Sequence, residues 1–337
     1  MKVTLKDIAE KTNVSISTVS RVLNNHPTSV DQHKIEEIVA LSKDLGYKKG
    51  RNTQRKDEKF SEVRFGCVLY NMKRKYYDPY FSEIIYGIER ELLDQGHILS
   101  FTYDTKELIQ SNYALDGDNL AIISVGSMEK EIISTLAKKA PVISAGGIPN
   151  NNVDFVTVDF FQAGMNAVTN LIEKGHRDIG FIGSSIRDSN LLLEEEGRYL
   201  GYQEALKKHN LPLISEWVQE GKFEITEGFH AMNKILEQKK RPTAVFIASD
   251  RMAYGAYKAI QSAGLSIPKD ISIIAFDNLE MSSFLTPPLT TIHVYKEEIG
   301  RIAVRMLIQK IQYNNSLPLQ TIVPTKLIDR NSCKFLI

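Results

Sequence analysis

The sequence predicts an α/β protein with a three-helix head and a two-lobed body that contains parallel sheets. Apolar residues recur at helical spacing throughout residues 1–46. From about Phe60 onward, continuous β-branched runs alternate with helical segments, as in parallel strands covered on both faces. The chain has 337 residues, which is more than one hydrophobic core usually serves. We therefore expect a head over 1–46, a basic linker over 47–59 and a body over 60–337.

Three short helices are expected in the head. Ser15 and Asp31 are suitable N-caps for the second and third helices, and Gly46 is a suitable C-terminal stop. Only three or four residues, around Thr12 to Ser15, separate the first two helices, and this spacing is typical of a helix-turn-helix. The apolar positions that define the helices are Leu5, Ile8, Ala9, Val19, Val22, Leu23, Ile35, Ile38, Val39 and Leu45.

The body is expected to contain many strand–helix units. About 278 residues of such units are more than a single doubly wound sheet usually contains, so we expect two lobes with a cleft between them. Expected strands lie at 63–70, 97–103, 119–125, 141–146, 154–159, 178–184, 216–221, 243–249 and 271–277. Expected helices lie at 79–95, 160–174, 193–209, 225–238 and 250–263.

The net charge of +1 hides an asymmetry along the chain. Residues 1–59 hold 12 Lys/Arg and 8 Asp/Glu, a net of +4, which leaves 42 − 12 = 30 bases and 41 − 8 = 33 acids, a net of −3, for the rest. The segment KKGRNTQRK (48–56) has five cations and no acid. A basic head on a slightly acidic body indicates that the head meets a polyanion, although a solvated basic tail would have the same charge.

Several classes of protein are not indicated. No run of about 18 apolar residues occurs, so no membrane span is expected, and MKVTLKDIAEKTN lacks the apolar core of a signal peptide. Cys67 and Cys333 are expected to be free thiols, and the dispersed histidines give no metal spacing; His97, His176 and His209 lie at helix ends, where surface roles are common. The sequence has no G-x-x-x-x-G-K-[ST] loop and no G-x-S-x-G elbow. We therefore expect a cytoplasmic protein that is not an enzyme and has no cofactor.

The second helix of the head is the expected DNA-reading element. Short hydroxyl side chains at a helix N-terminus can contact phosphates or base edges, and Arg21 adds positive charge, although an ordinary polar helix face has a similar composition. With the linker cations, the candidate DNA-binding residues are Thr4, Leu5, Ser15, Ile16, Ser17, Thr18, Ser20, Arg21, Asn24, Arg51 and Arg55.

The string TLKDIAEKTNVSISTVSRVLN (4–24) resembles the head of the lactose/galactose repressor family of bacterial transcription regulators. Ordered matches extend over nearly the whole chain: YFSEIIYGIE (80–89), VTVDFFQAG (156–164), GRYLGYQEAL (197–206), ASDRMAYGA (248–256), LTTIHV (289–294) and LIDRNSC (327–333). The resemblance implies a DNA-binding head and a periplasmic-binding-protein-like sensor that dimerises. It also implies that the lobes exchange chain segments near 160, 290 and 322. The chain ends soon after LIDRNSC, so we expect a dimer without an added tetramer helix.

The linker departs from the family pattern. Members of the family usually place a leucine of a hinge helix in the minor groove, and here Lys56 occupies roughly that position. A lysine is a poor apolar wedge between base steps, so we expect weaker DNA bending and a stronger dependence on salt. Arg51, Arg55 and Lys56 are expected to hold phosphates or enter a narrow minor groove.

The resemblance also implies a ligand site between the lobes. It assigns ligand contacts to Arg198, to Asp277 at the end of a buried strand, and to the stacking aromatics Phe223 and Phe81, with Ser249 and Asp159 as weaker candidates. A carboxylate accepts two sugar hydroxyls while a guanidinium donates to others. Some of these residues also have a possible structural role in place of ligand binding. This role is an ion pair for Arg198 and Asp277, core packing for Phe81, and a helix cap for Asp159.

These expectations describe a homodimeric repressor of a carbohydrate operon, of galactoside type, that an effector releases from operator DNA. Alternatives remain within the regulator class: a non-sugar effector such as a purine, a phosphoprotein partner, or an activator. A cytoplasmic binding protein without operator function is the alternative from another class, and the helix-turn-helix head opposes it.

Overall fold

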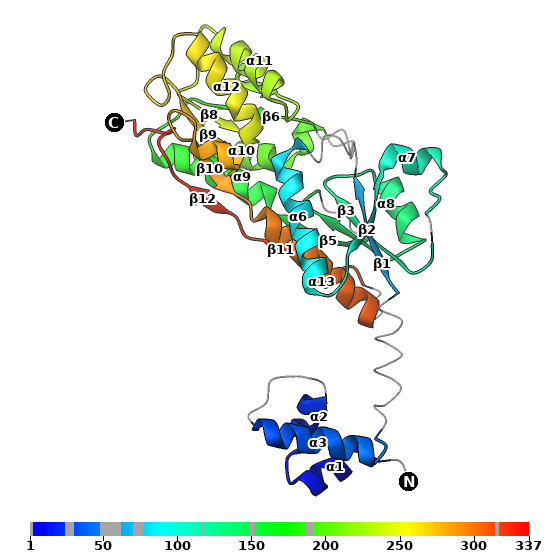
Figure 1. Ribbon diagram of the computed structural model, residues 1–337. Coiled ribbons are helices and arrows are strands. Elements are labelled where there is room, and N and C mark those ends of the chain that lie inside the picture. The colour runs from blue at the N-terminus through cyan, green and yellow to red at the C-terminus, as the bar shows by residue number, and fades with distance from the viewer. Residues whose placement is uncertain are drawn as a thin grey trace. The chain divides into compact units, whose positions relative to one another are not determined.

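The computed structural model describes residues 3–23, 30–47, 62–69, 77–115, 117–148, 152–185, 192–313 and 317–336. The chain divides into two compact units, which we call the head (Met1–Glu62) and the body (Val63–Ile337) (Figure 1). The class predicted from the sequence, a helix-turn-helix head with a parallel α/β body, is confirmed.

The head consists of α1 (Leu5–Thr12), α2 (Ile16–Leu23) and α3 (Gln32–Asp44). Asn13 ends α1 with φ 53°, a left-handed conformation that asparagine tolerates, so three residues suffice to turn the chain into α2. At the other end, Gly46 adopts φ 63°, and the Tyr47 N–H donates to the Ser42 carbonyl, which closes α3 as a Schellman motif. The predicted stop at Gly46 and the predicted cap at Asp31 are confirmed. The small core contains Ile8, Ala9, Val19, Val22 and Ile38.

The first lobe of the body is built on a six-stranded sheet in the order β11-β5-β4-β3-β1-β2, and all of its pairings are parallel. Helices α6 and α13 pack together against it, and α8 packs beside β4 (Figure 1). The elements are β1 (Arg64–Leu69), α6 (Pro79–Asp94), β2 (Leu99–Asp104), α7 (Thr105–Gln110), β3 (Leu120–Val125), α8 (Lys130–Ala137), β4 (Val142–Ala145), β5 (Asp154–Val158), α13 (Lys296–Tyr313) and β11 (Gln320–Val323).

The second lobe has a six-stranded sheet in the order β12-β10-β9-β8-β6-β7, in which only the β10–β12 pair is antiparallel. Two helix pairs accompany it, α9 with α10 and α11 with α12. The elements are α9 (Phe160–Glu173), β6 (Ile179–Gly183), α10 (Gly197–Lys208), β7 (Val218–Glu220), α11 (Ile225–Leu236), β8 (Ala244–Ile247), α12 (Asp250–Ser262), β9 (Ser272–Asp277), β10 (Thr290–His293) and β12 (Lys326–Ile328). Short 3-10 turns cover Leu193–Glu195, Ser215–Trp217 and Glu280–Ser283.

The chain passes between the two sheets three times. It leaves the first lobe after β5, returns from β10 to α13, and passes from β11 to β12. Lys296, the first residue of α13, therefore lies at one of the crossings.

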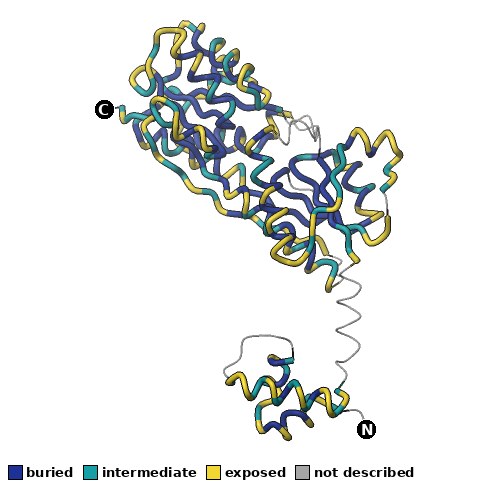
Figure 2. The backbone as a smooth tube through the Cα atoms, viewed as in Figure 1, coloured by how far each residue is buried: buried dark blue, intermediate teal, exposed yellow. Residues whose placement is uncertain are grey.

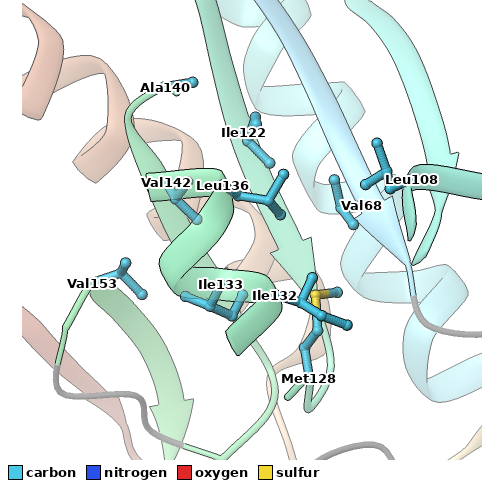
Figure 3. Packing of buried hydrophobic residues seen from close by; sticks show 10 residues of the cluster. All are labelled: Val68, Leu108, Ile122, Met128, Ile132, Ile133, Leu136, Ala140, Val142 and Val153. Carbon is cyan, nitrogen blue, oxygen red and sulfur yellow. The ribbon is translucent and has the colours of Figure 1, made fainter. Parts of the chain in front are cut away.

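Each sheet is buried between its helices, as the dark segments of Figure 2 show. In the first lobe, Val68, Ile122 and Val142 of three strands meet Ile132, Ile133 and Leu136 of α8, with Leu108 of α7 at the border (Figure 3). Continuous burial along β1, β3, β4 and β5 explains why these strands read as unbroken apolar runs.

The structure corrects three expectations. The helix predicted over 193–209 is broken: a 3-10 turn ends at Glu195, and α10 begins after Glu196, which caps it. Helices α7 and α8 were not predicted, because their six and eight residues give too few turns for a clear period. His176 is fully buried and not a surface residue; its ring nitrogens lie 2.9 Å from Thr243 Oγ1 and 3.2 Å from the Lys334 carbonyl oxygen. Both cysteines are free, as expected.

Candidate functional site

The N-terminus of α2 carries a compact group of hydroxyls. Ser15 Oγ lies 2.7 Å from Ser17 Oγ and 2.8 Å from Thr18 Oγ1, and it accepts the Thr18 N–H at 3.1 Å. This last bond is an N-cap, so the predicted capping role of Ser15 is present. Ile16, with 48% of its surface exposed, and Arg21 lie on the outside of the same helix. Within the described part of the head, the arrangement presents hydroxyls, one apolar side chain and one cation on the outer face of α2.

The remaining candidates of the head have other surroundings. Thr4 caps α1 in a reciprocal box with Asp7: its N–H donates to Asp7 Oδ2 at 2.7 Å, and its Oγ1 accepts the Asp7 N–H at 3.4 Å. Leu5 is half-buried and packs against the head core. Ser20 is also half-buried. Asn24, Arg51 and Arg55, together with Lys56, lie outside the described residues.

Arg198 lies in the first turn of α10, and only 6% of it is exposed. Its Nε donates to Glu196 Oε1 at 2.8 Å, and its Nη1 donates to the Ala248 carbonyl at 2.7 Å. Glu196 also caps α10 by accepting the N–H groups of Arg198 and Tyr199. Arg198 therefore makes a structural ion pair with Glu196, and among the described residues its Nη2 has no hydrogen-bond partner.

Three phenylalanine rings surround this guanidinium. The Arg198 Cζ lies 4.9 Å from the ring centre of Phe160 and 5.1 Å from those of Phe223 and Phe276. Cation–π contacts of this kind fix the guanidinium plane. Phe223 was predicted; it occupies a left-handed turn with φ 55° directly after Lys222 at φ 50°. Phe160 and Phe276 were not predicted, because both also fit the apolar pattern of a core.

Asp277 ends β9, and only 5% of it is exposed. Its φ of 113° lies in a region that non-glycine residues rarely adopt, and the next residue, Asn278, has φ 52°. Among the described residues, the Asp277 carboxylate has no hydrogen-bond partner. Burial, together with the nearby Asp250 carboxylate, raises the pKa of Asp277, and the Arg198 guanidinium acts in the opposite direction. A buried carboxylate with free acceptor positions is suited to bind a ligand's donors.

Ser249 and Phe81 complete the predicted set. Ser249 precedes α12, is buried, and makes no capping bond with its hydroxyl. Phe81 of α6 is half-buried and packs edge-on against Tyr80, 5.0 Å away. Burial raises the pKa of Tyr80, and the Asp277 carboxylate adds to the rise, so the phenol of the first lobe lies near the carboxylate of the second. Tyr80 was not predicted; its hydroxyl donates to the Gly146 carbonyl of the first lobe at 3.1 Å.

The two other carboxylates next to this region have structural partners. Asp159 Oδ1 accepts the Gln162 N–H at 2.9 Å, so the helix-cap reading of Asp159 is correct. Asp250 accepts hydrogen bonds from the Leu279 N–H, Ser282 Oγ and Thr291 Oγ1 at 2.6 to 2.7 Å. Burial raises the pKa of Asp250 to about 6. Asp250 therefore ties α12 to β10 and does not offer free oxygens.

The chain is similar to known proteins in both of its units. A family model described as "Bacterial regulatory proteins, lacI family" matches residues 4–49, and one described as "Periplasmic binding protein-like domain" matches residues 168–333. The transcriptional repressor PurR of Histophilus somni (strain 129Pt) is 32% identical over 316 residues, which cover 91% of this chain and 92% of the relative. The repressor MelR of Bacillus subtilis (strain 168) is 32% identical over 347 residues, which cover 98% and 97%. The chain belongs to the lacI family of bacterial regulatory proteins.

Solved structures agree with the fold of this lacI-family protein. The transcriptional regulator CelR in complex with cellobiose has a TM-score of 0.71 at 24% identity and covers 98% of this chain and 100% of its own. The lac repressor dimer bound to operator and the anti-inducer ONPF has a TM-score of 0.68 at 22% identity, with 99% and 100% covered. The lacI-family protein is thus a DNA-binding transcriptional repressor with a helix-turn-helix head and a binding-protein-like body.

Two cations that the sequence did not reveal join the lobes of this lacI-family protein. Arg251 of α12 donates to Glu224 Oε2 at 3.1 Å, and its Nε lies 3.7 Å from Asp78 Oδ2, the N-cap of α6. Lys296 lies 3.3 Å from Glu83 of the same helix. Over the described ranges, no helix is long and apolar enough to span a membrane, and no group of three potential metal ligands occurs.

Proposed function

We propose that the protein is a cytoplasmic homodimer that represses a carbohydrate operon and is released from its operator when a sugar binds the body. It acts by binding and not by catalysis. The observation that carries the proposal is the Asp277 carboxylate, buried at the end of β9 beside the Arg198 guanidinium, in a chain that also has a helix-turn-helix head.

The head supports operator binding through the free face of α2. Ser17 and Thr18 offer hydroxyl donors in the first turn of α2, and Arg21 offers a cation in its last turn. A helix is narrow enough to enter a major groove. The predicted contacts of Ser15, Ile16, Ser20, Asn24, Arg51 and Arg55 belong to the same proposal. Two heads of a dimer read half-sites of a roughly palindromic operator.

The body supports a polyhydroxyl ligand. Asp277 accepts two hydroxyls, Arg198 Nη2 and Ser249 Oγ bind further oxygens, and Phe223 with Phe81 covers an apolar sugar face. A phosphorylated ligand fits less well, because Asp277 and Asp78 already place negative charge at the site. The galactoside type of the effector rests on the resemblance of the segment YYDPYF (76–81), together with these anchors, to family members that sense galactosides.

Exposed apolar side chains support dimerisation. Tyr86 and Leu93 are more than half exposed and lie seven residues apart on α6, which places them on one face of the helix. Met281 and Phe284, at 57% and 71% exposed, lie three residues apart in the second lobe. Exposed apolar side chains that share a face are suited to pack against the same face of a second copy.

A ligand screen tests the effector class. The melting temperature of the full chain is measured with galactose, lactose, cellobiose, hypoxanthine, guanine and glucose 6-phosphate. A ligand at about 100 times its Kd stabilises the folded state by about 2.7 kcal/mol, which gives a clear rise in melting temperature. A rise in melting temperature with a sugar alone supports the proposal. A rise with a purine alone shows that the effector is a planar heterocycle and not a sugar. A flat result with all six refutes effector sensing of either class.

A second experiment tests operator binding. The full chain selects duplexes from a random pool, and an enriched duplex then serves as the probe. Arg21→Ala and Thr18→Val should each weaken binding to this probe while ligand affinity is preserved. Lys258→Ala, which removes an exposed cation of α12, is the matched control and should change neither. Equal affinity of Arg21→Ala and wild type would refute the role of α2.

A purine is the second candidate effector. The observation that favours it is the group of aromatic rings around Arg198, since a planar heterocycle stacks on such rings. The screen above separates the two ligands.

A further inference from the structure

Lys296 places a buried ammonium where the chain crosses between the lobes. Its side chain is 1% exposed. The Nζ donates to the Asp277 carbonyl at 2.8 Å and to the Val294 carbonyl at 3.4 Å, and it lies 3.3 Å from Glu83 Oε2. An ammonium has three N–H donors, so these three acceptors account for all of them. A cation this deeply buried persists only with complete pairing, and its acceptors belong to β9, the β10–α13 connection and α6.

The carbonyl that Lys296 holds belongs to a strained peptide. Asp277 and Asn278 both have positive φ, 113° and 52°, and their shared peptide group lies between them. Its oxygen accepts from Lys296, and its N–H, that of Asn278, donates to Thr291 Oγ1 at 3.3 Å. Such a conformation persists when surrounding contacts over-determine it, and it is often found at binding sites. The Lys296 ammonium therefore holds the backbone of the residue that carries the Asp277 carboxylate.

Helices α6 and α13 touch along their backbones beside the Lys296–Glu83 pair. A Cβ added at Gly87 of α6 would lie 2.0 Å from the Glu297 carbonyl oxygen, and one added at Gly300 of α13 would lie 2.1 Å from that of Ile84. The two helix backbones are thus in close contact at Glu297, which follows Lys296, and at Ile84, which follows Glu83. The same α6 begins at Asp78 and Tyr80, next to the ligand site.

We propose that Lys296 is a positioning residue that sets the Asp277 carboxylate for the ligand and relays ligand occupancy to α6 through Glu83. The proposal rests on the proposed function, because it takes Asp277 as a ligand anchor. A ligand that fixes the carboxylate fixes the following carbonyl as well, and so changes the position that the ammonium takes relative to Glu83. Lys296 itself does not touch the ligand.

The test measures two quantities on the full chain: the Kd of the probe ligand, and the ratio of DNA Kd values with and without saturating ligand. The ligand is galactose, cellobiose or hypoxanthine, whichever stabilises the wild type, and the DNA is the selected duplex. Typical coupling gives the wild type a ratio of about 5 to 150. Glu83 is 45% exposed, so Glu83→Gln should fold and should keep the ligand Kd within about twofold of the wild-type value. In this variant the DNA Kd values with and without ligand should differ by less than about twofold. Lys296→Met should also weaken the ligand about tenfold, and the double variant should be no worse than Lys296→Met.

Lys310→Met is the matched control. Lys310 lies on the same helix, but its ammonium pairs with Asp154 of the first lobe at 3.2 Å. This variant should keep both the ligand Kd and the ratio. A wild-type ratio in Glu83→Gln overturns the relay, and a wild-type ligand Kd in Lys296→Met overturns the positioning role. If Lys310→Met loses ligand affinity and coupling to DNA as much as Lys296→Met does, the proposal is also overturned, because the effect is then general destabilisation.

A second readout needs no ligand. Amide hydrogen exchange at Asn278 and Leu279 and in the first turn of α6 should accelerate at least about tenfold in Lys296→Met and stay unchanged in Lys310→Met. Unchanged exchange in Lys296→Met overturns the inference even where no probe binds. A flat ligand screen with accelerated exchange refutes the effector proposal alone.

Discussion

Replacing Arg198 with methionine tests whether one guanidinium both holds the second lobe together and anchors the ligand. The change removes the pair with Glu196, the hydrogen bond to the Ala248 carbonyl and the cation beside three phenylalanine rings. Methionine keeps a long unbranched side chain, so most of the packing volume is retained.

The expected loss in the free energy of unfolding follows from the groups that Arg198→Met leaves without a partner. Loss of a charged hydrogen bond costs about 1.5–3 kcal/mol. A buried carboxylate deprived of its cation costs about 3–5 kcal/mol, but Glu196 keeps two backbone N–H donors that reduce this penalty. The terms overlap because they share one group, so we expect a loss of about 3 kcal/mol in the free energy of unfolding. For a unit of this size, the melting temperature should fall by about 6–12 °C.

The assay is urea unfolding followed by the fluorescence of Trp217. This is the chain's single tryptophan, and it lies buried in the second lobe with its Nε1 donating to the Lys240 carbonyl at 3.0 Å. Changing Glu196 to Gln in the Arg198→Met background should recover about 1–2 kcal/mol, since the unpaired charge is then gone. Arg198→Met should also lose its ligand response. An unchanged unfolding midpoint would refute the structural reasoning, and a retained ligand affinity would refute the assignment of the site.

Four further predictions follow from single features. Glu91→Gln should lower the free energy of unfolding by about 2–3 kcal/mol in urea titrations, because Glu91 of α6 pairs with Arg301 and Arg305 of α13. Hydrogen bonds from Arg305 lower the pKa of Glu91 to about 2, so its contribution should be present above pH 4.5 and disappear toward pH 2; a variant with the wild-type pH profile would contradict this. Burial lowers the pKa of His176 to about 4, so stability should be full above about pH 6.5 and fall as the pH drops toward 4, by up to about 1.4 kcal/mol per pH unit. His176→Asn should flatten that slope in urea midpoints measured at pH 7 and 5, and an unchanged slope would refute the assignment. Gly87→Ala should lower the melting temperature, since the new Cβ would meet the Glu297 carbonyl at 2.0 Å and overpacking costs about 1–3 kcal/mol; a rise, as for glycine in a free helix, would show that α6 and α13 separate easily. Changing Arg51, Arg55 and Lys56 together to Ala should reduce the slope of log K against log[salt] by up to about 2.7, at about 0.9 per phosphate contact; a slope that stays steep would remove the proposed basic linker contacts.

The fold was predictable because its elements carry strong local signals. Buried parallel strands such as β3 and β9 are continuous apolar runs, and α6 begins with Asp-Pro and continues with apolar residues on one face. The head was predictable for the same reason, since Asp31 and Gly46 mark the two ends of α3.

The site was predictable only in part. Arg198, Phe223 and Asp277 were named, and the structure brings them together. The break before α10 was missed because residues 193–209 alone have the composition of one helix. Glu196 caps α10 with Oε2, which accepts the Arg198 and Tyr199 N–H groups, and a glutamate is not a usual N-cap. Lys296 and Arg251 were missed because their acceptors, Glu83 and Asp78, are more than 150 residues away in the sequence. Periodicity within a segment carries no information on such contacts.

The most direct test of the central claim is the affinity of the full chain for a selected duplex, measured by fluorescence anisotropy with and without the ligand found in the thermal screen. If one chain couples a DNA-reading head to a ligand-reading body, saturating ligand should change the Kd for this duplex by about 5- to 150-fold. The same ligand should leave the Kd of Arg198→Met unchanged. An identical DNA affinity of the wild type with and without bound ligand would contradict the account.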